Sequence, residues 1–421
     1  MRKPTWSLGI VGLALLTACG SGEDGSSGAD PAAGAGGQPA QTTIVELFSW
    51  WTQIGEAEAL QTLVDVHRRA HPDVRIFNAA AKNAEAARTL LEERFLQELP
   101  PDLYQENGHN LPTRVQAHPE RFAALDDLYD QLDLKRVMVP EVLRDVTVDG
   151  TVRAMPVALH RENSLFYDAT LLHAHGLSAP RSVPEWLSTC ATLKAAGVTP
   201  IAIGNQRWMH RALWSMVAMG SMGAAKYYAY YSGGELDEAA LTQAVSVYAD
   251  LLVNYSNAYE VSASYGWTDA AQDLFDGKAA MFPHGDWVKG YVMQLGWTPG
   301  IDFGVVGAPG ASEVFLYSLD VFVMPDGAPH AEQTRAFFAT IASPEAQLTF
   351  DTYKGASSIR LDLASEALDP VSSSTLDDLK NAEYRLTSHS GEDQALGDFY
   401  ASKDQKNLIL ALKSIHRYRS Q

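Results

Sequence analysis

Strand and helix patterns alternate in the first part of the chain, and this alternation limits the folds that it can adopt. Residues 44–48 and 74–77 are short runs rich in β-branched and aromatic residues, typical of buried strands. Between them, residues 56–69 carry apolar side chains at helical spacing, and residues 83–99 and 102–105 repeat the helix and the strand. Strands that are separated by helices pair in parallel through right-handed crossovers. We therefore expect an α/β fold with a mainly parallel sheet.

The same patterns start again near residue 158, which predicts a second α/β unit. A strand pattern at 201–203 lies between two helical patterns, and Asp149-Gly150 is a typical turn of a hairpin before this unit. Open α/β sheets bind ligands beyond the carboxyl ends of their strands, so two such lobes that face each other form a cleft. We expect a hinge near residues 157–160. The predicted lobes are residues 44–157 with about 272–325, and residues 158–271 with about 326–421.

The N-terminus has the parts of a secretory signal in the usual order. After a positive start, the apolar run at residues 8–16 is too short to span a membrane. The following Leu16-Thr17-Ala18-Cys19 resembles the lipobox of bacterial lipoproteins, which implies removal of residues 1–18 and a lipid on Cys19. An ordinary signal peptide with a chance cysteine is the alternative. Residues 19–43, rich in Gly, Ser and Ala, are then a flexible tether.

Charge and hydropathy narrow the range of partners. The chain has 32 Lys and Arg against 51 Asp and Glu, a net charge of −19, so it repels polyanions and no nucleic-acid partner is expected. No second apolar run is long enough to span a bilayer, so we expect membrane contact through the lipid alone. With Cys19 acylated, Cys190 has no cysteine left to pair with, and no intramolecular disulfide is expected.

Several short motifs follow one another in a specific order. They are Phe48-Ser49-Trp50-Trp51 with Gly55-Glu56, Pro100-Pro101-Asp102, His160-Arg161-Glu162-Asn163, Gly285-Asp286-Trp287 and Lys354-Gly355. In this order they resemble the sugar-binding proteins of ATP-binding-cassette (ABC) importers, which are bacterial extracellular solute-binding proteins of family 1, and among them the glucose-binding branch. The resemblance implies a two-lobe periplasmic-binding-protein fold and a monomer without a cofactor. It also implies capture of a glucose-like monosaccharide or small oligosaccharide outside the cytoplasm, and delivery to the transmembrane subunits of an ABC permease.

A sugar site needs groups that match both the hydroxyls and the apolar face of a pyranose. Carboxylates accept two hydroxyl protons at once, in bonds worth about 1.5–3 kcal/mol each, and an indole covers the C–H face. Asn107 stands where the glucose-binding branch commonly has a lysine, and the stretch after Lys354-Gly355 also departs from that branch. Together with the resemblance, this chemistry gives the ligand-binding candidates Trp50, Trp51, Glu56, Asn107, His160, Trp267, Asp286, Asp320 and Lys354. Trp208 and His389 are weaker candidates.

Several of these candidates also have a structural explanation. Trp50 and Trp51 are adjacent and point to opposite sides of an extended segment, so one of them is expected in the core. Glu56 fits the first turn of a helix through the helix dipole, and Asp286 fits the N-cap of the helix that follows it. Asp320 lies within a predicted strand, where a carboxylate is costly unless paired, so it either faces the cleft or forms a buried ion pair.

Three other functions fit parts of the sequence. Paired carboxylates with tryptophan also occur in glycoside hydrolases, but the common motifs of hydrolases and phosphate loops are missing, and we expect no enzyme activity. His67 and His71 have the spacing of zinc ligands, but their place at a positively charged helix end favours a role in capping, and no metal site is expected. A sensor that presents its sugar to a receptor would have the same sequence features as an importer component.

Overall fold

The computed structural model describes residues 42–79, 84–388 and 391–420. The predicted signal segment, the lipidation candidate Cys19 and the weaker ligand candidate His389 lie outside these residues. The tether was expected to reach residue 43, but the first strand, β1 (Thr43–Phe48), already includes Thr43. Within the described residues, no helix is both long enough and apolar enough to cross a bilayer.

The larger sheet has the strand order β12-β11-β3-β1-β2, with β6 paired to β11. Besides β1, its strands are β2 (Val74–Asn78), β3 (Leu103–Asn107), β6 (Met155–Arg161), β11 (Val314–Val323) and β12 (Tyr384–Thr387). β1 pairs in parallel with β2 and with β3, as the alternation of strands and helices predicted. β11 runs antiparallel to β3 and β6, and parallel to β12. The sheet is therefore mixed, because the late strand β11 enters it in the opposite direction.

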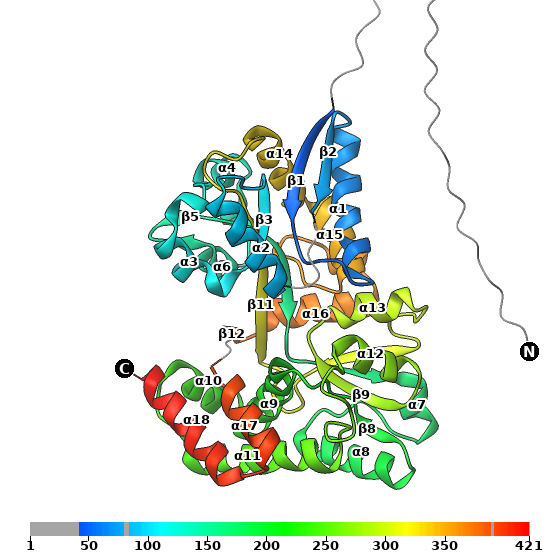
Figure 1. Cartoon of the computed structure of the whole chain (residues 1–421). Coiled ribbons are helices and arrows are strands. Elements are labelled where there is room, and N and C mark those ends of the chain that lie inside the picture. The colour runs from blue at the N-terminus through cyan, green and yellow to red at the C-terminus, as the bar shows by residue number, and fades with distance from the viewer. Residues whose placement is uncertain (1–41, 80–83, 389–390, 421) are drawn as a thin grey trace, which may run out of the picture. The chain divides into compact units, whose positions relative to one another are not determined.

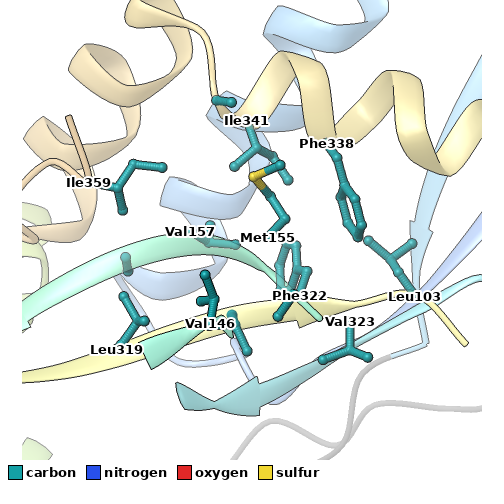
Figure 2. Close-up of a cluster of buried hydrophobic side chains, with 14 of the residues drawn as sticks. Leu103, Val146, Met155, Val157, Leu319, Phe322, Val323, Phe338, Ile341 and Ile359 are labelled. Atoms are coloured by element: carbon teal, nitrogen blue, oxygen red, sulfur yellow. The ribbon is translucent and has the colours of Figure 1, made fainter. Parts of the chain in front are cut away.

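Helices cover the larger sheet with their apolar sides. Those packed in this core are α1 (Glu56–Ala70), α2 (Ala84–Leu96), α14 (Ala331–Ile341) and α15 (Pro344–Lys354). Figure 1 shows α1 and α15 beside β1 and β2. Figure 2 shows part of the buried cluster, in which Met155 of β6 and Phe322 of β11 lie near Phe338 and Ile341 of α14. Burial of such side chains stabilises the layer by about 25 cal/mol per Å² of apolar surface.

The smaller sheet has the strand order β10-β7-β9-β8. Its strands are β7 (Ser164–Asp168), β8 (Thr199–Ile201), β9 (Ala279–His284) and β10 (Phe303–Gly307). β8 and β9 are parallel, whereas β7 pairs antiparallel with both β9 and β10. The main helices of this core are α8 (Val183–Ala195), α9 (Arg207–Met222), α11 (Glu238–Asn254), α12 (Trp267–Phe275), α13 (Val288–Gln294), α17 (Asp393–Ser402) and α18 (Gln405–Arg419).

Short elements connect these layers. They are α3 (Leu111–Ala117), α4 (Asp126–Gln131), α5 (Leu134–Val137), α6 (Pro140–Asp145), α7 (Ala169–Ala174), α10 (Ala224–Ser232) and α16 (Pro370–Asn381). The predicted hairpin is confirmed as β4 (Thr147–Val148) and β5 (Thr151–Val152). Its turn residues Asp149 and Gly150 have φ angles of 50° and 75°, as a type I′ turn requires.

Two buried hydrophobic clusters define two lobes. We call the first lobe the part built on residues 45–159 and 315–382, and the second lobe the part built on residues 165–316 and 386–412, with Val371 as an addition. This division differs from the predicted ranges, because β9 and β10 join the second sheet and α14 and α15 pack on the first. Alternation of strands and helices predicts that two units exist, but not which sheet a late strand joins.

Candidate functional site

A cavity of about 530 Å³ lies between residues of the two lobes. The first lobe contributes the segment after β1 and the end of β3, and the second contributes the beginnings of α9 and α12. Eight of the nine predicted ligand residues line this cavity: Trp50, Trp51, Glu56, Asn107, His160, Trp267, Asp320 and Lys354. Asp286 is not among the lining residues. Trp50, Trp51 and Asn107 come together because β1 and β3 are parallel neighbours that finish at the same edge of the sheet.

Trp50 and Trp51 have different surroundings, as expected for adjacent residues of an extended segment. Trp51 is only 1% exposed and packs in the core, where its ring centroid lies 5.6 Å from that of Phe322 and 5.5 Å from that of Phe350. Trp50 is half-buried, and the Arg88 guanidinium lies 5.2 Å from its ring centroid. The indole of Trp50 therefore offers the cavity a flat apolar face.

Hydrogen-bonded polar side chains line the cavity. Asn107 and Asp320 are opposite each other in the β3–β11 register, and Nδ2 of Asn107 donates to Oδ1 of Asp320 at 2.8 Å. Nη2 of Arg88 donates to Oδ1 of Asn107 at 2.6 Å, which fixes the orientation of the amide. At another wall, Nζ of Lys354 lies 3.1 Å from Oε1 of Glu56. These pairs hold the polar atoms in place before any ligand arrives, which favours tight binding.

His160 lies between two carboxylates from different elements. Its Nδ1 is 2.6 Å from Oδ1 of Asp286, and its Nε2 is 3.5 Å from Oδ2 of Asp320. Burial and the Lys354 ammonium lower the pKa of His160, but the carboxylates outweigh them and the pKa is raised above its ordinary value. The pKa of Asp320 is lowered, because His160 and Lys354 outweigh the effect of burial. Asp320 is thus a buried, paired carboxylate that also faces the cavity.

Asp286 lies behind His160 and does not face the cavity. Besides its contact with His160, its Oδ2 accepts from the backbone N–H of Arg161 at 2.7 Å. The alternative role as an N-cap is wrong, since α13 begins at Val288 and its N-cap residue is Trp287 rather than Asp286. Its carboxylate therefore acts on the cavity through the imidazole.

Other lining residues were ranked low or missed in the sequence. Trp208 and Trp287 both line the cavity, and so does the ion pair in which Nη1 of Arg211 lies 3.1 Å from Oε2 of Glu162. Ser388 Oγ also donates to Oε2 of Glu162 at 2.6 Å. Glu162 belongs to the His160-Arg161-Glu162-Asn163 motif, which is a usable signal. Arg211 carried no signal, because an arginine within a helical pattern has the same appearance as a solvated one.

The histidines with zinc-ligand spacing are packed in a different way from a metal site. His67 and His71 stack with their ring centroids 4.5 Å apart, and Nδ1 of His67 lies 2.8 Å from Oγ1 of Thr340. Burial lowers the pKa of His67 to about 4. In the part of the chain that the structure describes, no three His, Cys, Asp or Glu side chains are grouped so as to hold a metal ion.

Known proteins share both the sequence pattern and the fold. An uncharacterised ABC transporter extracellular-binding protein of Pyrococcus horikoshii is 27% identical over 393 residues, covering 91% of this chain and 87% of that protein. A xylose/arabinose-binding protein of Haloferax volcanii is 27% identical over 366 residues, covering 82% and 76%. A solved bacterial solute receptor, described as preferring β-D-galactopyranose, has a TM-score of 0.74 at 13% identity over 90% of this chain and 98% of its own.

A further solved structure and a protein-family model also match this chain. The fold also matches that of a solved solute-binding protein in complex with raffinose, with a TM-score of 0.69 at 17% identity, over 90% of this chain and the whole of that one. The family model for bacterial extracellular solute-binding proteins matches residues 69–375, well over half of the chain. This chain therefore belongs to the bacterial extracellular solute-binding protein family.

Proposed function

We propose that this protein captures a neutral sugar, a glucose-like monosaccharide or a small oligosaccharide, in the cavity between its lobes and delivers it to an ABC importer. The observation that carries the proposal is the lining itself, in which Trp50, Trp208, Trp267 and Trp287 stand around paired carboxylates. Indole faces suit the C–H surface of a pyranose, and carboxylates suit its hydroxyls. The relatives named as sugar-binding proteins support the same ligand class.

Charge in the cavity favours a neutral ligand. The lining acids Glu56 and Glu162 are paired with Lys354 and Arg211, and Asp320 is shared between Asn107 and His160. An anionic ligand would have to displace one of these carboxylates from its cation, which leaves a buried charge unpaired at a cost of several kcal/mol. A neutral polyol can bind without breaking any of the pairs, because each carboxylate keeps lone pairs free for hydroxyl protons.

The proposed mechanism is closure of the lobes around the sugar. A ligand that contacts Trp50 and Asn107 on one lobe and Trp267 on the other binds the closed form better than the open form, and this difference drives closure. The sugar undergoes no reaction in this scheme. Membrane attachment through a lipid on Cys19 completes the proposal, and the change Cys19→Ser should release the protein from the membrane fraction.

A thermal-shift screen of monosaccharides and disaccharides, followed by isothermal calorimetry, tests this function. A true ligand at one hundred times its dissociation constant should stabilise the protein by about 2.7 kcal/mol. Trp50→Ala should abolish the shift, whereas Lys135→Ala, on an exposed ion pair with Asp130, should leave it unchanged. The proposal is refuted if no sugar shifts the melting temperature, or if a bound glycoside is hydrolysed.

A further inference from the structure

A single histidine outside the cavity contacts three of the tryptophans that line it. His284 is the last residue of β9 and is 0% exposed. Its ring centroid lies 5.0 Å from that of Trp208, 5.9 Å from that of Trp267 and 4.9 Å from that of Trp287. The three indoles come from the beginnings of α9, α12 and α13, which are separate segments of the chain. The imidazole is therefore a common contact of three elements that are separate in the sequence, although Trp208 and Trp287 also contact each other, with ring centroids 6.0 Å apart.

The angles between the rings differ in a way that orients each indole. The imidazole plane makes angles of 69° with Trp208 and 77° with Trp287, both edge-to-face, but only 32° with Trp267. Aromatic pairs prefer edge-to-face arrangements of this kind, which stabilise them beyond the burial of area. Gly285 adds a second restraint, because a Cβ atom at this position would overlap the Trp287 indole. The indole of Trp287 thus lies directly on the backbone beside His284.

The contacts of the imidazole are mainly aromatic. Its Nδ1 lies 3.3 Å from the carbonyl oxygen of Gly285, and its Nε2 has no hydrogen-bond partner among the residues that the structure describes. Burial lowers the pKa of His284 to about 3, so the ring is neutral at physiological pH. A neutral ring packs against π faces without the desolvation cost of an imidazolium.

We propose that His284 is a positioning residue that sets the relative orientation of Trp208, Trp267 and Trp287, and thereby determines which sugars fit the cavity. The inference rests on the proposed function and deepens it. His284 itself does not touch the ligand, since it is absent from the cavity lining. Selectivity among sugars depends on the angle at which their C–H faces meet the indoles, and this angle is fixed from behind by the imidazole.

Substitution at His284, with a matched buried histidine as control, tests the inference. His284→Ala should raise the dissociation constant of the best sugar about tenfold and change the preference between the two best sugars at least about threefold. In the ligand-free protein, near-ultraviolet circular dichroism should lose much of its tryptophan signal. His67 is equally buried and has a lowered pKa, and its Nε2 also lacks a hydrogen-bond partner within the described part of the chain, but it contacts Phe337 in the first lobe. His67→Ala should lose stability while keeping the sugar preference and the tryptophan signal.

Two further variants separate ring packing from simple space filling. His284→Phe keeps a flat ring and should retain the preference, whereas His284→Gln keeps polarity without a ring and should lose it, even if the alanine variant does not fold. The inference is overturned if His284→Gln melts like the wild type, keeps the wild-type spectrum and binds sugars in the wild-type ratio. If the wild-type protein binds no sugar at all, the proposed function is refuted instead. The circular dichroism spectra of the ligand-free variants then still decide whether His284 orients the indoles.

Discussion

Gly355→Ala is predicted to destabilise the protein through a contact between the two lobes. Gly355 follows α15 in the first lobe with a φ of +84°, and an alanine Cβ would lie 2.9 Å from Cβ of Lys289 and closer still to the carbonyl oxygen of Asp286. Asp286 lies just before α13 of the second lobe, and Lys289 lies in its first turn. The left-handed backbone costs an alanine about 1–2 kcal/mol. The overlap adds about 1–3 kcal/mol, because neither backbone can move alone.

Gly327→Ala is the matched control for this prediction. Gly327 has a φ of +73°, but no atom of the described residues lies within 4 Å of the position that its Cβ would take. Gly327→Ala therefore has the same backbone strain in the folded state and the same loss of conformational entropy in the unfolded chain as Gly355→Ala. Both effects cancel when the stabilities of the two variants are compared. Equilibrium unfolding in urea should place Gly355→Ala below Gly327→Ala by about 1–3 kcal/mol, at an unchanged slope. Equal losses in the two variants would refute the claim that the lobes touch at Gly355.

Three further predictions concern groups around the cavity. Asp286→Asn should lower the pKa of His160, which NMR titration measures. In the wild type the raised pKa stabilises the fold below pH 6.5, and this stabilisation is lost as the pH rises through the pKa of the folded state. The variant should therefore lose less stability above pH 6.5. Lys289→Met should lower the free energy of unfolding in urea by about 3–5 kcal/mol, because the Lys289 side chain is 1% exposed and its ammonium is paired with Asp369. A smaller loss would show that methionine packs well at this position. Trp208→Ala should weaken sugar binding about tenfold in calorimetry, and wild-type affinity would remove its indole from the site.

The fold was predictable where local pattern and pairing coincide. β1, β2 and β3 alternate with helices, and their parallel pairing follows from that order. The Asp149-Gly150 hairpin was predictable because few dipeptides accept two positive φ angles. The lobe boundaries were not, since β11 pairs with strands about 160 and 215 residues earlier in the chain, and no local signal selects those partners.

The sequence predicts which residue types gather at the candidate site, but not which of them line the cavity and which lie behind the lining. Sugar-binding chemistry and the family resemblance together gave eight residues that line one cavity, of which five are tryptophans or carboxylates. The sequence could not place Asp286 behind His160, since two side chains 126 residues apart meet only through the tertiary fold. It also gave no role to His284, because a histidine within an apolar strand has the pattern of an ordinary core residue.

The strand β11 has a consequence for how the chain is made. Val314 and Leu316 belong to the second core, whereas Phe315, Tyr317 and Leu319 belong to the first. One strand therefore contributes buried side chains to both cores. The first core also needs residues up to 382, and the second needs residues up to 412. Neither lobe can finish folding until nearly the whole polypeptide has left the ribosome, and pairings over such long separations form slowly. A chain that stops near residue 310 should therefore yield no folded lobe at all.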